Sequence, residues 1–311
     1  MIQKTFRCFT HFALIIGAVM LMSAAAFAQY PIGQSSIGDM KPGSVLFYSR
    51  YSSNPANPAM GDTQINITNV NQSAGTSVHL YLVDGATCSI ADSFIGLTQN
   101  QTASFLVSDF DPGITGYIVA VATGGGGPTQ FNSLIGSEFI RETNGTTAYL
   151  QAITVAKRSA GDVVPDVNGQ TVLIFNGVDY EQLPSALAVA TFNSQTQDTN
   201  SLSIFSPANN LLIGGVVSTS VFTLLYNDAE VAISTSFTVN CYRYETFTSL
   251  FNRGGGINRH VPSGRTGWIR MTASGRPILG SVFGRGPVFV GGHNLHAIAL
   301  LGSYSITVPS F

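Results

Sequence analysis

Residues 113–124 read Gly-Ile-Thr-Gly-Tyr-Ile-Val-Ala-Val-Ala-Thr-Gly, and residues 264–275 repeat the pattern as Gly-Arg-Thr-Gly-Trp-Ile-Arg-Met-Thr-Ala-Ser-Gly. In each copy a second segment follows and closes on glycine: residues 132–136 ending at Gly136, and residues 280–284 ending at Gly284. A Gly-x-Thr-Gly-aromatic-Ile strand, a turn and a second strand are typical of antiparallel β structure. Their presence twice predicts two tandem copies of one β domain.

The composition also favours an all-β fold. Only 10% of the residues are charged, compared with about 25% in an average domain. Valine, isoleucine, phenylalanine and threonine are abundant between glycine-rich turns, and such residues favour strands. Short strands at this spacing predict β-sandwiches of the immunoglobulin-like kind.

Further matches set the predicted domain boundaries. Residues 157–170 contain Pro165 and an Asn-Gly turn and break the strand pattern, so we expect a linker there. The prediction is a first β-sandwich at residues 44–156 and a second at residues 171–311, with one larger sandwich or barrel as the alternative. The matched segments are residues 44–48 with 171–175, residues 65–69 with 202–206, and residues 80–84 with 222–228.

The first 28 residues have the three parts of a secretory signal peptide. Lys4 and Arg7 precede an apolar run at residues 12–22, and Ala26-Phe27-Ala28 is a small-residue cleavage signal. The apolar run is too short to span a bilayer. Residues 29–43 are rich in Gly, Ser and Pro and are predicted to be an extended leader segment. We therefore expect a secreted, extracellular or cell-surface protein with no membrane span in the mature chain.

Two cysteines, Cys88 and Cys241, remain after the predicted cleavage, one in each predicted domain. An oxidising compartment permits a disulfide between them. Two buried free thiols are the alternative.

Charge is distributed unevenly along the chain. All 16 acidic residues lie at or before Glu245, and six arginines follow it. This asymmetry favours an anionic partner or head-to-tail self-association, and scattered solvated arginines are the alternative. A head-to-tail contact of this origin should weaken with salt, since the Debye length falls from about 10 Å at 0.1 M to about 3 Å at 1 M.

The two copies of the opening pattern differ on one face of the strand. Both faces of residues 117–122 are apolar, which predicts a strand buried on both sides. In the second copy Trp268 and Arg270 share a face opposite the apolar side chains. We predict that Trp268, Arg270 and Arg265 form a ligand-binding site for a sugar ring of an extracellular glycan or an anionic group. The alternative is that Trp268 belongs to the core and Arg270 lies over it.

Catalytic and metal-binding signatures are absent from the sequence. It has no G-x-S-x-G, P-loop, H-E-x-x-H or C-x-x-C motif. In a β context His293 and His296 are expected on opposite faces of a strand. Asp109 and Asp111 lack the later ligands of a calcium loop and are expected to cap a turn. We predict no catalytic residue, metal or cofactor, and no nucleic-acid partner.

These features together favour a secreted, non-enzymatic protein that acts in adhesion, surface assembly or extracellular ligand binding. A carbohydrate-binding module that uses Trp268 is the first alternative. A secreted hydrolase with an unrecognised site is the second. The third is an outer-membrane β-barrel, because the last strand ends on Phe311, although Pro309 interrupts it.

Overall fold

The computed structural model describes residues 37–166, 168–194, 199–252, 256–286 and 290–309. In these residues the helices are short turns, and the paired strands are antiparallel, so the all-β prediction is confirmed. None of the helices in these ranges is long and apolar enough to cross a membrane. The helices are η1 (Pro58–Met60), η2 (Val107–Asp109), α2 (Phe247–Leu250) and α3 (Ile257–His260).

The predicted signal peptide, residues 1–28, and residues 29–36 of the predicted leader lie outside the described residues. The end of the leader is described. Ile37 is buried, and Gly38 pairs with Thr154. This end of the predicted leader is therefore packed against the strands that follow it.

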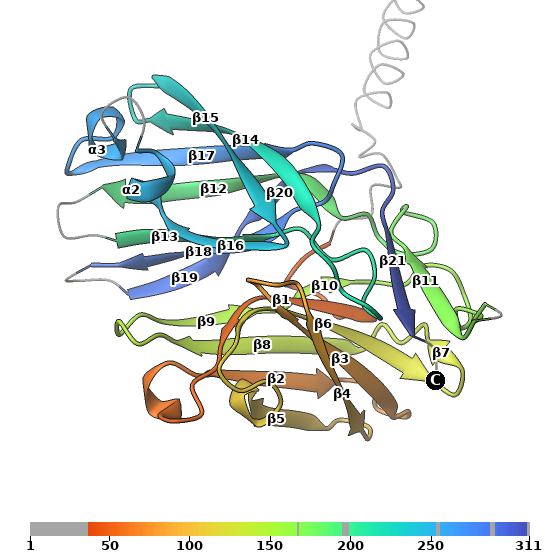
Figure 1. Ribbon diagram of the computed structural model, residues 1–311. Coiled ribbons are helices and arrows are strands. Elements are labelled where there is room, and N and C mark those ends of the chain that lie inside the picture. Colours follow the sequence, from red (N-terminus) through yellow and green to blue (C-terminus); the bar gives the residue numbers. More distant parts are fainter. Residues whose placement is uncertain (1–36, 167, 195–198, 253–255, 287–289, 310–311) are drawn as a thin grey trace, which may run out of the picture. The chain divides into compact units, whose positions relative to one another are not determined.

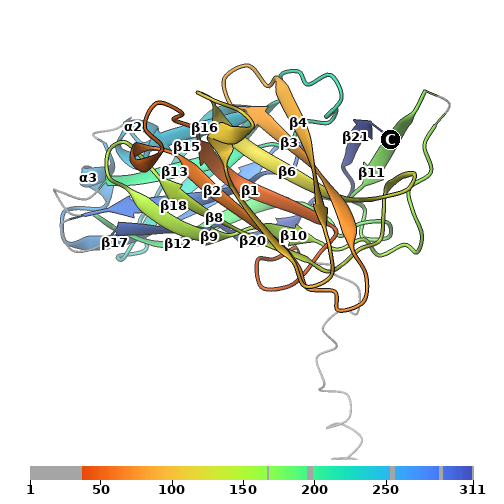
Figure 2. The same ribbon diagram turned by 90° about the horizontal axis from the view of Figure 1, so that it is seen from below.

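Residues 45–155, which we call the first half, form two antiparallel sheets. Their orders are β10-β1-β6-β3-β4, with β7 paired to β6, and β5-β2-β8-β9. Figure 2 shows β2, β8 and β9 side by side in the second of these sheets. Leu46, Ile67 and Ile118 belong to the buried core between the two sheets. The strands are β1 (Val45–Ser52), β2 (Thr63–Asn69), β3 (Thr76–Asp84), β4 (Ile90–Leu97), β5 (Thr102–Leu106), β6 (Thr115–Gly124), β7 (Gly127–Pro128), β8 (Leu134–Arg141), β9 (Thr147–Gln151) and β10 (Ile153–Val155).

Residues 184–300, the second half, follow the order β19-β18-β13-β16-β15-β14-β17-β12-β20. The strands β15 and β16 meet at one residue pair, Asn240 with Tyr242. This pair divides the order into two sheets, and Leu202, Ile269 and Val282 belong to the core between them. The strands are β12 (Pro184–Ser194), β13 (Thr199–Phe205), β14 (Ser218–Asn227), β15 (Ala232–Asn240), β16 (Tyr242–Thr246), β17 (Arg265–Ala273), β18 (Leu279–Arg285), β19 (Val290–Asn294) and β20 (His296–Leu300).

The two halves share one pattern of strand pairing. The order β10-β1-β6-β3-β4 corresponds to β20-β12-β17-β14-β15, and β5-β2-β8-β9 corresponds to β16-β13-β18-β19. Both β1 and β12 shift register just before the residue that pairs with Gly116 or Gly267 of the repeated motif. Non-glycine residues with positive φ also recur in corresponding turns, which supports an internal repeat. Cys88 lies between β3 and β4, and Glu230 lies between β14 and β15. In the next turn of each half, Asn100 lies between β4 and β5, and Cys241 lies between β15 and β16.

Two details of the predicted alignment are wrong. Residues 171–175 were matched to the first strand, but β11 (Gln170–Ile174) pairs with β21 (Ser305–Pro309) in a separate two-stranded ribbon. A short apolar strand does not specify its partner, and the counterpart of β1 is β12. In addition, Gly136 pairs with Ile67 as Gly280 pairs with Ile204. The counterpart of Gly136 is therefore Gly280 rather than Gly284.

The immunoglobulin-like order predicted from the sequence does not appear in these sheets. In that order the first strand lies beside the second. Here β1 pairs with β6 and β10, and β2 belongs to the other sheet. The predicted linker, residues 157–170, leads into β11, and Lys157 pairs with Tyr180. The predicted domain boundaries stay a prediction, and the described residues belong to one compact unit.

The outer face of the sheet that contains β6 is buried, as both apolar faces of residues 117–122 predicted. Phe205 and Leu279 of the second half pack on it, together with the β11–β21 ribbon. The Tyr117 ring stacks on Phe205 with 4.2 Å between ring centroids. Figure 1 shows β9 and β19 side by side where the halves meet. We call this surface the covered face; it comprises Val45, Phe47, Tyr81, Val83, Tyr117 and Val119.

A disulfide also joins the halves. Cys88 and Cys241 are bonded, and their Cα atoms lie 6.1 Å apart. Both residues are buried beside Val217. The alternative of two free thiols is therefore wrong.

Candidate functional site

The strand β17 presents Trp268 and Arg270 to solvent. Ile269 and Met271 are buried, whereas Trp268 is 38% exposed and Arg270 is exposed. This alternation is the one that the sequence predicted. The alternative, in which Trp268 is a buried core residue, is wrong.

An aromatic pair dominates this surface. Trp268 pairs across the sheet with Tyr226, and the two rings are nearly parallel, at 7° with centroids 4.5 Å apart. Phe222 lies further along β14 on the same face and is 48% exposed. Parallel aromatic rings with exposed edges and faces can stack on a flat apolar surface of a ligand or partner. We call this surface the open face; it comprises Phe222, Leu224, Tyr226, Trp268, Arg270 and Thr272.

The three predicted site residues do not come together. Arg270 lies between Leu224 on β14 and Ala188 on β12, two residues from Trp268 on the same face. Arg265 stands at the start of β17, on the side opposite to Trp268 by strand alternation. Its guanidinium pairs with Asp228 at 2.6 Å. The structure therefore groups Trp268 with Arg270 and leaves Arg265 in a separate ion pair.

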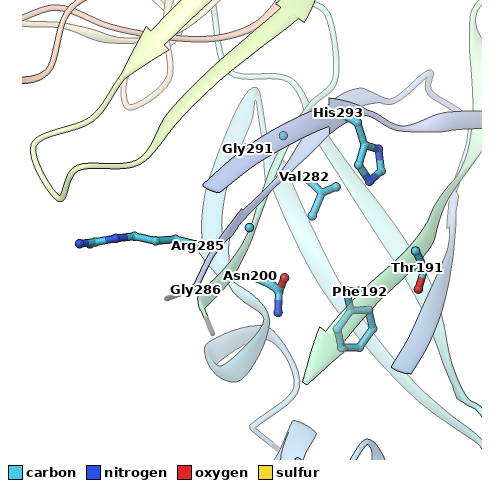
Figure 3. Close-up of a pocket in the computed structure, with 10 residues that line it drawn as sticks. Thr191, Phe192, Asn200, Val282, Arg285, Gly286, Gly291 and His293 are labelled. Carbon is cyan, nitrogen blue, oxygen red and sulfur yellow. The ribbon is translucent and has the colours of Figure 1, made fainter. Parts of the chain in front are cut away.

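A cavity of about 320 Å³ opens beside β12, β18 and β19 in the second half. Figure 3 shows Phe192, Val282 and His293 directed toward the cavity, whereas the Arg285 side chain extends away from it. Glycines make up much of the remaining wall. The lining residues are Thr191, Phe192, Asn200, Val282, Gly284, Arg285, Gly286, Gly291, Gly292 and His293.

The histidines do not form a metal centre with other residues in the part of the chain that is described. No group of three His, Cys, Asp or Glu side chains in that part is placed to hold a metal ion. His293 and His296 were expected on one strand, but they lie on β19 and β20, with ring centroids 6.1 Å apart.

Buried polar groups gather where the two halves meet. The Arg50 Nε donates to Glu142 Oε1 at 2.7 Å, and the Arg50 guanidinium lies 3.6 Å from the centroid of the Tyr244 ring. The Tyr244 hydroxyl donates to Glu142 Oε2 at 3.0 Å. Sequence reasoning missed this cluster, because its members come from strands far apart in the chain.

Glu138 is fully buried near this cluster. The Ser49 hydroxyl donates to its Oε1 at 3.0 Å, and its Oε2 has no hydrogen-bond partner within the described residues. Burial raises the pKa of Glu138 to about 8. A carboxyl with such a pKa can transfer protons near neutral pH. Its complete burial, however, gives a substrate no access, so we assign it a structural role.

A second repeated motif was also missed. Residues 136–141 read Gly-Ser-Glu-Phe-Ile-Arg on β8, and residues 280–285 read Gly-Ser-Val-Phe-Gly-Arg on β18. Aligning Gly136 with Gly284 hid this match, although the shared Gly-Ser-x-Phe-x-Arg pattern is visible in the sequence.

Comparison with known proteins gives no family assignment. No family model and no curated protein matches the sequence. Thermotoga maritima 1070 aligns over 42% of this chain and 95% of its own at 6% identity, with a TM-score of 0.25. The Pleurotus ostreatus lectin aligns over 90% and 81% at 11% identity, with a TM-score of 0.15. Bacteroides uniformis β-glucuronidase 2 aligns over 87% and 28% at 9% identity, also at 0.15. Such low TM-scores carry no argument about fold or function.

Proposed function

We propose that the chain is an exported, non-enzymatic protein of two related β-sandwiches that acts in adhesion or surface assembly by binding through the open face. The observation that carries the proposal is the contrast between corresponding sheet faces: the covered face is buried, and the open face exposes aromatic side chains. Aromatic residues and arginine are enriched where proteins bind partners, and exposed apolar patches on soluble proteins mark binding sites.

Two further observations support this proposal. The Cys88–Cys241 disulfide fits an oxidising compartment and therefore export. The cavity beside β12, β18 and β19 is lined mostly by apolar side chains and glycines, and the strongly perturbed carboxyl, Glu138, is enclosed between the halves. An accessible cleft with converging acid and base side chains would favour the alternative of a secreted hydrolase.

The open face is tested by removing its aromatic pair. We expect the W268A/Y226A variant to lose binding to immobilised polysaccharides or to immobilised wild-type protein, whichever the wild type binds. Val172→Ala is a suitable control because Val172 is 42% exposed on β11, which is not part of the open face. Equal binding by wild type and W268A/Y226A, or no binding of wild type to either surface, would refute the proposal.

Carbohydrate binding is a second candidate, favoured by the parallel Trp268–Tyr226 pair with Arg270 on the same face. Sugar rings present apolar faces that stack on aromatic side chains, and arginine can donate to hydroxyl or acidic groups. Retention of wild type on a glycan column, lost in Trp268→Ala and retained in Val172→Ala, would support this candidate. Unchanged retention of Trp268→Ala would exclude it.

A further inference from the structure

The contact between the two halves provides a template for a contact between two chains. Phe283 of β18 packs on Ile140, Ala148 and Leu150 of the first half. On the same outer face of β18 the Ser281 hydroxyl is hydrogen-bonded to Ser49 at 2.8 Å. The outer face of the β16-β13-β18-β19 sheet therefore packs against one side of the first half.

The cavity in the second half lies at the counterpart of the Phe283 contact. Strand pairing places Ile140 opposite Ala148, and it places Gly284 opposite Gly291 at the corresponding positions. Likewise Leu150 pairs with Glu138, and His293 pairs with Val282. The side chains that hold Phe283 in the first half are thus replaced by two glycines and a histidine. The resulting space, about 320 Å³, has no side chain of the described residues filling it.

The first half exposes a surface that resembles the one on β18. The shared motif places Phe139 and Arg141 on β8 where Phe283 and Arg285 lie on β18. Phe139 is partly exposed, and Ile135, on the same outer face, is 38% exposed. The neighbouring Tyr149 on β9 is 60% exposed. This sheet therefore presents a phenylalanine at the strand position of Phe283, with Tyr149 across the sheet where Phe283 has Gly292.

We propose that chains assemble head to tail, with the outer face of the β5-β2-β8-β9 sheet of one copy docked on the second half of the next and Phe139 entering its cavity. The proposal rests on the proposed function and names a second copy as the partner of the open face. Ile135 is the counterpart of Leu279, which packs on the covered face, so the docked sheet would place Ile135 over the open face of the next copy. Within the described residues, each chain therefore offers one cavity as the acceptor and one exposed sheet face as the donor. Their contact is heterologous, so it extends into open chains rather than closing as a symmetric dimer.

The contact between chains should be weaker than the contact within one chain. Arg50 corresponds to Thr191, and Tyr244 corresponds to Ser104, so the buried arginine cluster has no counterpart. The disulfide also acts only within the chain. Arg141 of the donor and Arg270 of the acceptor half carry the same charge. The uneven charge of the sequence predicted a contact between chains that weakens with salt. These two surfaces do not attract each other by opposite charge at those arginines, so we do not expect this contact to weaken with salt.

Complementation between two blocked variants tests the proposal. Phe139→Glu removes the donor, and Thr191→Trp narrows the acceptor from an exposed position on the cavity wall. Sedimentation velocity should show concentration-dependent oligomers for wild type and monomers for each variant alone. An equimolar mixture of the variants should form a one-to-one dimer, because the intact donor of Thr191→Trp can enter the intact acceptor of Phe139→Glu. This dimer should not extend, because its remaining donor and its remaining acceptor are the blocked ones.

Phe94→Ala is the control, because Phe94 is a 47% exposed aromatic residue on β4, outside both surfaces. It should assemble like wild type. Ile135→Glu is a second donor variant in case Phe139→Glu does not fold, which circular dichroism reports. The proposal is overturned if wild type stays monomeric at its highest soluble concentration, if the blocked variants assemble normally, or if their mixture gives no dimer. Retained polysaccharide binding by wild type in that case would leave the proposed function standing.

Discussion

The covered face and the open face belong to corresponding sheets, and they differ in the size and charge of a few side chains. Val119 lies between Phe47 and Tyr81 in the first half. The corresponding Arg270 lies between Ala188 and Leu224 in the second. Large flanking side chains with a small central one make a surface that packs on another layer. In the open face the flanking side chains are smaller, and Arg270 is exposed to solvent.

One strand order therefore supports either an interior sheet or a surface sheet. Backbone pairing is the same in both halves, so it does not decide which face is buried. Whether an outer face is buried depends on its side chains and on the segments that cover it. Phe205, Leu279 and the β11–β21 ribbon do this for the first half.

Exchanging the central residues should produce the largest and most asymmetric effect. Val119→Arg would bury an unpaired charge among the apolar side chains of the covered face, and we expect it to lower the free energy of unfolding by more than about 4 kcal/mol. Arg270→Val alters an exposed position and should change that free energy by at most about 0.5 kcal/mol. Urea unfolding of both variants measures the difference.

Val119→Thr is the milder substitution to use if Val119→Arg does not fold. It retains the shape of the side chain and adds one buried hydroxyl, which we expect to cost about 1–3 kcal/mol. Similar losses of stability in Val119→Thr and Arg270→Thr would show that the two faces do not differ in burial as the structure indicates.

The disulfide should have the next largest effect, since it holds the second half against the first. Cys88 and Cys241 are 153 residues apart in the chain. Removing a native disulfide from a small secreted domain typically costs about 2–5 kcal/mol, and we expect the C88S/C241S variant to unfold with a loss in that range. Thermal unfolding of the oxidised wild type and the variant measures it. An unchanged midpoint would show that the covered face holds the halves together without the bond.

Alternation within single strands was the part of this contrast that the sequence could predict. The buried Ile269 and Met271 and the exposed Trp268 and Arg270 follow from a period of two, as does burial on both sides of residues 117–122. Periodicity reports which side chains share a face. It does not report which strand or layer lies next to that face.

Pairing between distant segments could not be predicted in the same way. Residues 171–175 had the apolar pattern of the first strand but joined β21, because several short strands in the chain fit that pattern equally well. The cavity escaped prediction for a related reason. In the sequence, Gly284 and Gly291 look like ordinary strand glycines. Their importance emerges only from the structure, in which their counterparts Ile140 and Ala148 contact Phe283.

Glu138 should make the stability of the protein depend on pH. Its counterpart on β18 is the apolar Val282, so this contribution comes from the first half alone. Burial raises the pKa of Glu138 from 4.5 to about 8 in the folded state. The folded protein therefore binds more protons than the unfolded chain between these values, and stability falls as pH rises through that window. A single group of this kind contributes about 1.4 kcal/mol per pH unit.

Glu138→Gln should remove this contribution, because the amide does not titrate and keeps the size of the carboxyl. Denaturant unfolding between about pH 4.5 and 8 should then show a flatter pH profile for the variant than for wild type. Glu230→Gln is the matched control, since Glu230 is exposed in the second half and should leave the profile unchanged. Equal dependence of the unfolding free energy on pH in wild type and Glu138→Gln would contradict this prediction. It would place the proton uptake on another group and would show that the contact between the halves tolerates an ionised carboxylate at Glu138.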